Sequence, residues 1–404
     1  MAQKGYIFKK KGRWYGRWRQ DVIEKDSDGK PRIVRVQHCE KLCECSDRYR
    51  RKKDVQPLLD QKLRPLNEGR ISAESTLSVR EYAETFFLPH ADRELRPATA
   101  HGYRALWKTY LGARLENNTL RDFRCVDATN LLAEIHRTHN LGRATLSHCK
   151  GLLSVIFTHA KRSGVLDAPN PVRDAGIPRS AKSGETHAYS PQEFISMIGA
   201  LDGVAKTAVA LMYLAGLRPA EARGLKWSDY DKKSKTIRVS RSMWRGFITN
   251  PKTEESVGSV PVPQVLADIL DAVPRTSEYV LTSPAGKLVG RGRWEPRPVD
   301  LHNLASRVIR PALAKCATCK KEQHTASGHE YQRIGEWRGF YALRRGCATL
   351  ASSLDTPLAA KSLLRHSNVQ TTAAYYIKSV PDDAVRAVQK IDALLQTTTG
   401  DRAN

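Results

Sequence analysis

The amino-acid sequence predicts a multidomain fold: a small N-terminal β-sheet with a helix, an all-α helical bundle, and a mixed α+β C-terminal domain. Three observations predict it. Tyr-, Trp-, Val- and Ile-rich runs alternate with turn residues near the N-terminus, amphipathic helical patterns follow, and helices and strands then mix. The chain of 404 residues has room for two to four domains at roughly 100–200 residues each.

The first segment, 1–75, reads as short strands followed by a helix over 47–66. Its strand-like runs are GYIFKKKG, RWYGRWRQDVIE and KPRIVRVQ, and none of the first twenty residues is acidic. A small basic sheet can place strands in a DNA groove. The alternative is a sheet whose aromatic residues only fill its own core, and both can hold because opposite faces of a strand do different jobs. The candidate DNA-binding residues are Lys9, Lys10, Lys11, Arg13, Arg17 and Arg19.

The second segment, 76–175, is predicted to be a compact helical module that binds DNA. Its apolar residues recur at helical spacing, Thr76 or Ser78 is a plausible N-cap, and Gly164 is a natural helix stop. A helical bundle without a specific function is the alternative. Residues 176–186 are rich in Gly, Ser and charge and read as a linker to the third segment, 187–404.

The charge of the chain favours a polyanionic partner. Lys and Arg number 67 against 42 Asp and Glu, for a net charge of +25 and a pI of about 9.8. Neutralised phosphates release counterions, so double-stranded DNA is the leading candidate, with a basic but non-binding surface as the alternative. No long apolar run or secretory signal is present, which predicts a soluble cytoplasmic protein without membrane contact.

Arg218 lies where one predicted helix ends at Gly216 and the next begins at Pro219. An Arg fixed by backbone on both sides can present a bidentate fork to a phosphate. Glu221 lies one turn further on and is placed to orient it. The alternative is an Arg that caps the carbonyl groups of the preceding helix.

Further chemically suited residues follow at wide intervals. Lys252 lies near a predicted hairpin tip, Arg344 falls in the first turns of a helix that opens near Gly339, and His366 precedes Tyr375 by nine residues. Each has a plainer explanation on its own: a solvated Lys, a satisfied polar His, or a Tyr that packs or decorates the surface.

Together and in this order, these residues resemble the tyrosine recombinase, or phage integrase, family. The matching boxes are GLRPAE with Arg218 and Glu221, a Lys-Thr pair with Lys252, YALRRG with Arg344, LLRHS with His366, and TTAAY with Tyr375. The resemblance covers the third segment nearly end to end. The first two segments resemble the family's arm-binding domain and its SAM-like core-binding domain more weakly.

Two residues depart from the family pattern. Tyr341 stands where the family usually has His, and Arg365 stands where it usually has Gly. Near neutral pH a phenol is a poorer proton acceptor than imidazole, so the role of Tyr341 stays open.

The resemblance implies a site-specific recombinase that integrates or excises a mobile genetic element. Tyr375 would attack a DNA phosphodiester and form a 3′-phosphotyrosine link on the way to a Holliday junction. Arg218, Arg344 and His366 would stabilise the transition state, and Lys252 would protonate the leaving oxygen. These cationic groups would replace metal ions, so no cofactor is expected for catalysis.

The resemblance also implies partners. They are DNA attachment sites, three further copies of the chain in a tetramer on two DNA sites, and accessory directionality or DNA-bending proteins, on nucleoid-associated DNA. An amphipathic helix over 380–396 would dock on a neighbouring protomer. A topoisomerase with a Tyr nucleophile fits less well because of the three-part layout and the TTAAY ending. A catalytically inactive, recombinase-derived DNA-binding regulator is the alternative that Tyr341 favours.

The eight cysteines do not suggest a disulfide framework, because no secretory signal precedes them. Cys316, Cys319, His324 and His329 have a spacing similar to a zinc knuckle, which predicts a structural zinc in the 316–329 insertion. A flexible insertion with two chance cysteines is the alternative. A second, less regular cluster comprises His38, Cys39, Cys43 and Cys45.

Overall fold

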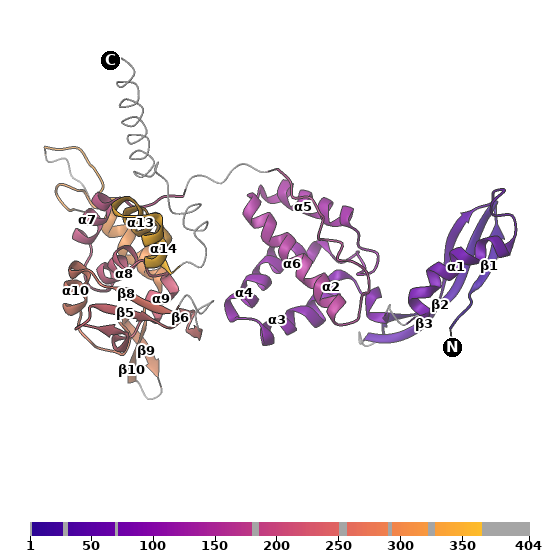
Figure 1. Ribbon diagram of the computed structural model, residues 1–404, viewed down its shortest axis with the longest axis horizontal. Coiled ribbons are helices and arrows are strands. Elements are labelled where there is room, and N and C mark those ends of the chain that lie inside the picture. Colours follow the sequence, from indigo (N-terminus) through magenta and orange to yellow (C-terminus); the bar gives the residue numbers. More distant parts are fainter. Residues whose placement is uncertain are drawn as a thin grey trace, which may run out of the picture. The chain divides into compact units, whose positions relative to one another are not determined.

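The computed structural model describes residues 2–26, 31–68, 72–179, 186–249, 257–289, 293–321 and 328–365. The chain divides into two compact units, Met1–Gly184 and Glu185–Asn404 (Figure 1). The predicted fold class is confirmed: a small antiparallel sheet, a helical bundle and a mixed α/β domain follow one another. The finer division at 75, 175 and 186 stays a prediction.

The N-terminal sheet has the strand order β1-β2-β3 and is antiparallel throughout. Its strands are β1 (Tyr6–Lys10), β2 (Arg13–Lys25) and β3 (Pro31–Glu44), followed by helix α1 (Lys52–Asn67). Trp14 and Trp18 are buried in one core with Val55, Leu59 and Leu63 of α1. The helix therefore covers one face of the sheet, as the alternation of side chains along β2 requires.

The helical bundle has a separate core made largely of aliphatic and Phe side chains. Ser78 is the N-cap of its first helix, and its Oγ accepts a hydrogen bond from the backbone N–H of Glu81, as the sequence predicted. The elements of the bundle are η1 (Ala73–Thr76), α2 (Val79–Tyr82), η2 (Ala83–Phe87), α3 (Leu88–Glu94), α4 (Pro97–Leu106), η3 (Trp107–Leu111), η4 (Gly112–Arg114), α5 (Cys125–His139) and α6 (Arg143–Arg162).

The C-terminal unit mixes helices with three small sheets, ordered β4-β5-β8, β6-β7 and β10-β9. Its helices are α7 (Pro191–Gly199), α8 (Gly203–Leu214), α9 (Pro219–Gly224), α10 (Gln264–Asp271), α11 (Leu301–Leu304), α12 (Arg310–Ala314), α13 (Phe340–Leu354) and α14 (Pro357–Leu364), with short helical turns η5 (Trp227–Asp229) and η7 (Ala305–Ile309). Its strands are β4 (Tyr230–Asp231), β5 (Thr236–Val239), β6 (Ser242–Trp244), β7 (Phe247–Thr249), β8 (Gly258–Pro261), β9 (Thr282–Val289) and β10 (Arg293–Pro298).

Helix α8 forms the centre of this unit, and α13 packs directly against it. Residues 207–213 of α8 are all buried, and α8 is the helix predicted to end before Arg218. A Cβ on Gly346 of α13 would lie 2.4 Å from the Tyr189 carbonyl oxygen and 2.7 Å from Cε2 of Tyr213. Only glycine allows this approach, which fixes the position of the helix that carries Arg344.

Several predicted functional residues lie outside the described residues. They are Lys252, His324, His366, Tyr375 and the helix over 380–396. Among the described helices, none is long and apolar enough to cross a membrane.

Candidate active site

Arg218 is the N-cap residue of α9, with Pro219 in the first turn, as the sequence predicted. The loop before it turns at Gly216, whose φ is +59°, and a Cβ there would meet Cδ2 of Leu364 at 2.7 Å. A side chain at Gly216 would therefore be both strained and obstructed. This glycine lets the loop before Arg218 pack against the last turn of α14.

Glu221 accepts hydrogen bonds from two arginines and is itself buried. Its carboxylate oxygens lie 2.6 Å from Nη1 of Arg218, 2.9 Å from the backbone nitrogen of Arg218 and 2.6 Å from Nη2 of Arg365. The guanidinium of Arg218 thus turns toward Glu221, the contact predicted from the sequence, and its side chain stays 30% exposed. A buried carboxylate between two guanidinium groups holds both in fixed directions.

Arg344 lies fully buried on α13. Its Nη2 donates to the Leu364 carbonyl oxygen at 2.7 Å, and its Nη1 donates to the Gly216 carbonyl oxygen. One guanidinium therefore connects the loop that precedes Arg218 with the end of α14. Arg365, which follows Leu364, is the last described residue and directly precedes His366 in the sequence. In this state the Arg344 guanidinium faces the interior.

Arg365 is a site residue that the sequence reasoning did not select. It ends α14 in the left-handed conformation at φ 54°, which explains why glycine is usual there and costs Arg about 1–2 kcal/mol. Its side chain is 5% exposed and paired with Glu221. Burial lowers the pKa of Arg365, while the charge of Glu221 raises it. The sequence signal was the Arg in LLRHS at a position that favours glycine.

Tyr341 lies one helical turn before Arg344, yet its side chain is 54% exposed. The two residues of the YALRRG box therefore differ in environment: one faces solvent and the other the interior. Arg345, the next residue of α13, donates a hydrogen bond from Nε to the His187 carbonyl oxygen at 2.6 Å.

A second cluster of polar side chains lies in the insertion between α12 and α13. The ligand atoms of Cys316, Cys319 and His329 lie within 4.8 Å of one another, and Sγ of Cys316 is 3.3 Å from Nε2 of His329. Backbone N–H groups, that of Cys319 foremost, lower the pKa of the Cys316 thiol to about 5. These three residues could bind a metal ion.

The second, less regular cluster noted in the sequence comprises His38, Cys39, Cys43 and Cys45. Among the described residues, the segment from His38 to Cys45 contains no comparable group of ligands. His38 packs on Trp18 of the neighbouring strand, whereas Cys39, the next residue of β3, is exposed. Successive side chains of a strand point to opposite faces, which separates the two.

Comparisons with known proteins agree with this architecture. No family model matches the chain. It is 26% identical over 327 residues to the tyrosine recombinase XerC-like protein of Caldanaerobacter subterraneus subsp. tengcongensis, covering 74% of this chain and 78% of that protein. The chain is thus similar in sequence to a tyrosine recombinase over about three quarters of its length.

Two solved structures share the fold of this chain. A Tn1549 transposon integrase in complex with a circular intermediate DNA superimposes with a TM-score of 0.59 at 18% identity, covering 78% of this chain and 99% of that one. A lambda integrase tetramer bound to a Holliday junction gives a TM-score of 0.51 at 17% identity, covering 91% and 96%. The second match extends over the N-terminal region as well.

The N-terminal sheet of the chain separates its basic residues by face. The pairs Lys10–Arg13 and Tyr6–Arg17 lie opposite each other across β1 and β2, so Lys10, Arg13 and Arg17 share the face away from α1, and Arg19 follows them by alternation. Lys9 lies on the other face, with Nζ 5.9 Å from the centre of the Trp14 ring. Lys11 is in the turn, at φ 46°. Buried tryptophans and an exposed basic face thus occur in one sheet.

We expect the face of the sheet away from α1, called the outer face, to contact DNA. Replacing Arg17 and Arg19 together by Ala should weaken DNA binding and reduce the slope of log K against log salt by roughly 0.9 for each phosphate that is no longer neutralised. Fluorescence anisotropy over a salt series measures both. Lys9→Ala is the matched control, because that lysine lies on the α1 side of the sheet. Equal weakening by the control and the double variant would contradict the assignment of the outer face.

Proposed function

We propose that this recombinase cuts and rejoins DNA at specific sites through a covalent link between Tyr375 and a 3′-phosphate. The observation that carries the proposal is the joining of Arg218, Glu221, Arg344 and the end of α14 into one cationic cluster. In the sequence, α14 leads directly into His366 and then Tyr375. The Tn1549 and lambda integrases named above were solved in complex with DNA.

The chemistry explains why such a cluster is needed. An unperturbed Tyr has a pKa of about 10, so roughly 0.1% is phenolate at pH 7. The phenol passes its proton to solvent water as its oxygen bonds to phosphorus and the bond from phosphorus to the 5′ oxygen breaks. Negative charge gathers on the non-bridging oxygens. Arg218, Arg344 and His366 stabilise that charge, and Lys252 protonates the departing 5′ oxygen. The phosphotyrosine retains the energy of the broken bond, and positive side chains supply the stabilisation that metal ions supply elsewhere.

Arg344 must reach the phosphate from its buried position. In the proposal, it exchanges its bond to the Leu364 carbonyl oxygen for a phosphate oxygen when DNA binds. Such a change is favourable because the phosphate brings a full negative charge to the guanidinium and can accept two parallel N–H···O hydrogen bonds from it. The Arg365–Glu221 pair next to Leu364 keeps the end of α14 close to the site.

The proposed biological role is integration or excision of a mobile genetic element. It requires two DNA attachment sites, a tetramer and a Holliday junction. A tetramer bound to a Holliday junction is what the lambda integrase structure contains. The helix over 380–396 would dock on a neighbouring copy. Accessory directionality or DNA-bending proteins belong to the same proposal.

A nicked suicide substrate tests this function. The DNA carries a site selected from a random pool by its affinity for the recombinase. The wild-type chain should form a covalent protein–DNA adduct, and Tyr375→Phe should form none. Tyr376→Phe is the matched control and should retain the adduct.

Two results would count against this function. Loss of the adduct in Tyr376→Phe together with its retention in Tyr375→Phe would move the nucleophile by one residue. Tight DNA binding by the wild type with no adduct would favour the inactive DNA-binding regulator.

A further inference from the structure

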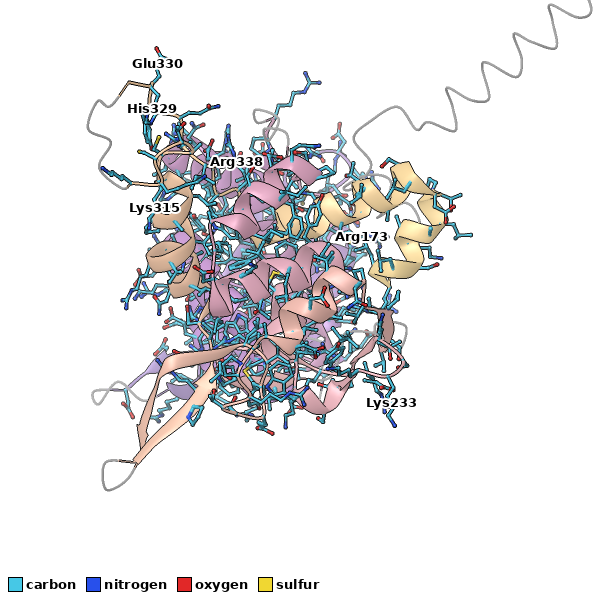
Figure 2. The ribbon with its side chains drawn as sticks, turned by 90° about the vertical axis from the view of Figure 1, so that its left-hand side faces the viewer. Arg173, Lys233, Lys315, His329, Glu330 and Arg338 are labelled. Carbon is cyan, nitrogen blue, oxygen red and sulfur yellow. The ribbon has the colours of Figure 1, made fainter. Side chains whose placement is uncertain are left out.

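The insertion between α12 and α13 is closed at its base by backbone hydrogen bonds. Ile334 donates its N–H to the Lys315 carbonyl oxygen at 3.0 Å, and Ala317 donates to that of Gln332 at 2.6 Å. Cys316 and Arg333 form an antiparallel bridge. Two extended segments of the insertion, 315–317 and 332–334, therefore lie side by side. The ligand atom of His329 lies close to those of Cys316 and Cys319. Figure 2 shows His329 and Glu330 on this loop at one edge of the unit, near Lys315.

The two cysteines lie in a tight turn. The Lys320 N–H donates to the Cys316 carbonyl oxygen at 2.9 Å, the Cys316 N–H donates to that of Lys321 at 3.1 Å, and Lys320 adopts φ 60°. The sulfur of Cys316 accepts hydrogen bonds from the backbone N–H groups of Thr318 and Cys319. Amide donors aimed at a sulfur fix its direction, as outer-shell partners do around metal-binding ligands.

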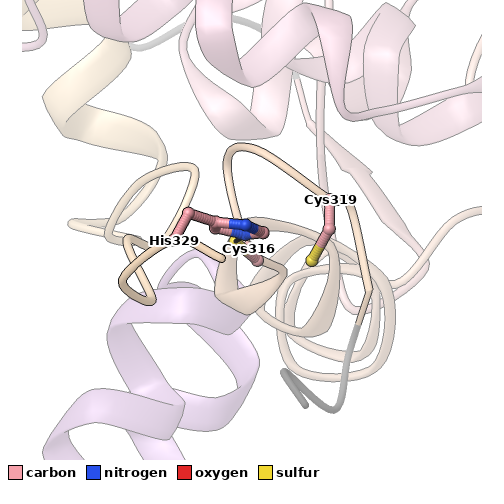
Figure 3. A group of neighbouring side chains, drawn as sticks. All are labelled: Cys316, Cys319 and His329. Atoms are coloured by element: carbon pink, nitrogen blue, oxygen red, sulfur yellow. Dashed lines mark hydrogen bonds between the residues drawn. The ribbon is translucent and has the colours of Figure 1, made fainter. Parts of the chain in front are cut away.

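The three ligand atoms converge on a common space (Figure 3). Zinc bonds of about 2.3 Å to sulfur and about 2.0 Å to nitrogen in a tetrahedron place ligand atoms roughly 3.5–3.8 Å apart. The 3.3 Å from Cys316 Sγ to His329 Nε2 is already near this value, and all three atoms lie within 4.8 Å. Small side-chain rotations bring them to bonding positions.

We propose that Cys316, Cys319 and His329 bind one Zn²⁺ ion that holds the insertion closed. Thiolate and imidazole ligands together select zinc over the oxygen-binding cations Mg²⁺ and Ca²⁺. Three protein ligands leave one tetrahedral position to a further donor. The site is independent of the proposed reaction, because it shares no described residue with the Arg218–Glu221–Arg344 cluster.

The ion would stabilise the segment that leads into α13. Directly after the insertion, the Glu336 carbonyl oxygen accepts a hydrogen bond from the Tyr189 hydroxyl at 2.9 Å, and the Arg338 N–H donates to the same hydroxyl at 2.5 Å. Residues 336–338 are thus tied to the core immediately before the helix that carries Arg344. A closed insertion fixes the other end of this short connection.

Metal analysis of the purified full-length recombinase tests the site. The wild-type chain should contain about one zinc per chain, as a structural thiolate site does, whereas Cys316→Ser and His329→Ala should lose it. Cys125→Ser is the matched control, since Cys125 is an exposed thiol in the other unit. Tyr375→Phe should retain zinc, so a failure of the proposed reaction is separable from a failure of this site.

Two further measurements test the metal site even if a variant folds poorly. Cobalt added to metal-free wild-type protein should give a thiolate-to-metal charge-transfer band. A chelator should lower the melting temperature of the wild type and leave that of His329→Ala unchanged. Wild-type protein without zinc and without a cobalt band, or equal zinc in Cys316→Ser and Cys125→Ser, would overturn the proposal.

Discussion

Replacing Arg218 by Ala should slow formation of the covalent DNA adduct by about 10²–10³-fold, the cost of one preorganised donor to an anionic transition state. The side chain is suited to that role because Glu221 holds it at 2.6 Å while 30% of it stays exposed. Its structural role is smaller, since the backbone N–H of Arg218 still bonds to Glu221 in the variant.

Single-turnover kinetics on the suicide substrate measure this effect. Lys233→Ala is the matched control: it removes one positive charge from an exposed turn of the same unit (Figure 2). The control should react at the wild-type rate. An Arg218→Ala rate within a few-fold of that of the control would show that Arg218 does not contact the reacting phosphate.

Replacing Glu221 by Ala should destabilise the C-terminal unit by about 3–5 kcal/mol, the range for removing one partner of a buried ion pair. The variant leaves Arg365 as a guanidinium that is 5% exposed and has no carboxylate to balance it. Adding Arg365→Gly should recover part of the stability. The second change removes the buried charge and relieves about 1–2 kcal/mol of left-handed backbone strain.

Hydrogen exchange of α13 and α14 peptides in a urea series measures the free energy of unfolding of the C-terminal unit separately from that of the N-terminal unit. Glu278→Ala is the control, because Glu278 pairs with Lys226 at 2.6 Å but is 58% exposed, and loss of such a pair costs about 1 kcal/mol or less. Additive destabilisation in Glu221→Ala/Arg365→Gly would mean that the two side chains do not interact.

Local sequence predicted those elements whose cause is local. The strands of the first segment follow from alternating aromatic and basic residues, and the Arg218 junction follows from Gly216 and Pro219. The helix predicted over 47–66 begins at Lys52 instead, where the Asp54 carboxylate accepts the N–H of Arg51 at 2.8 Å. Boundaries of this kind depend on a single capping contact.

The environments of Arg344 and Arg365 could not be predicted from local sequence. YALRRG contains two adjacent arginines, and the one that faces the interior is decided by the packing of Gly346 against Tyr189. Arg365 is buried by a partner 144 positions away. Local sequence also predicted the metal ligands only in part. The spacing of Cys316 and Cys319 in a turn indicated that they lie close together. His38 and Cys39 are adjacent in the sequence, but the alternation of side chains along the strand places them on opposite faces.

A methylphosphonate at the scissile position tests whether Arg218 balances charge on the reacting phosphate. It replaces a charged non-bridging oxygen with a neutral methyl group, which removes the charge that Arg218 is proposed to balance. We expect Arg218→Ala to form the adduct faster on this substrate than on ordinary phosphate, and Tyr375→Phe to stay inactive on both. An Arg218→Ala variant equally slow on the two substrates would contradict it.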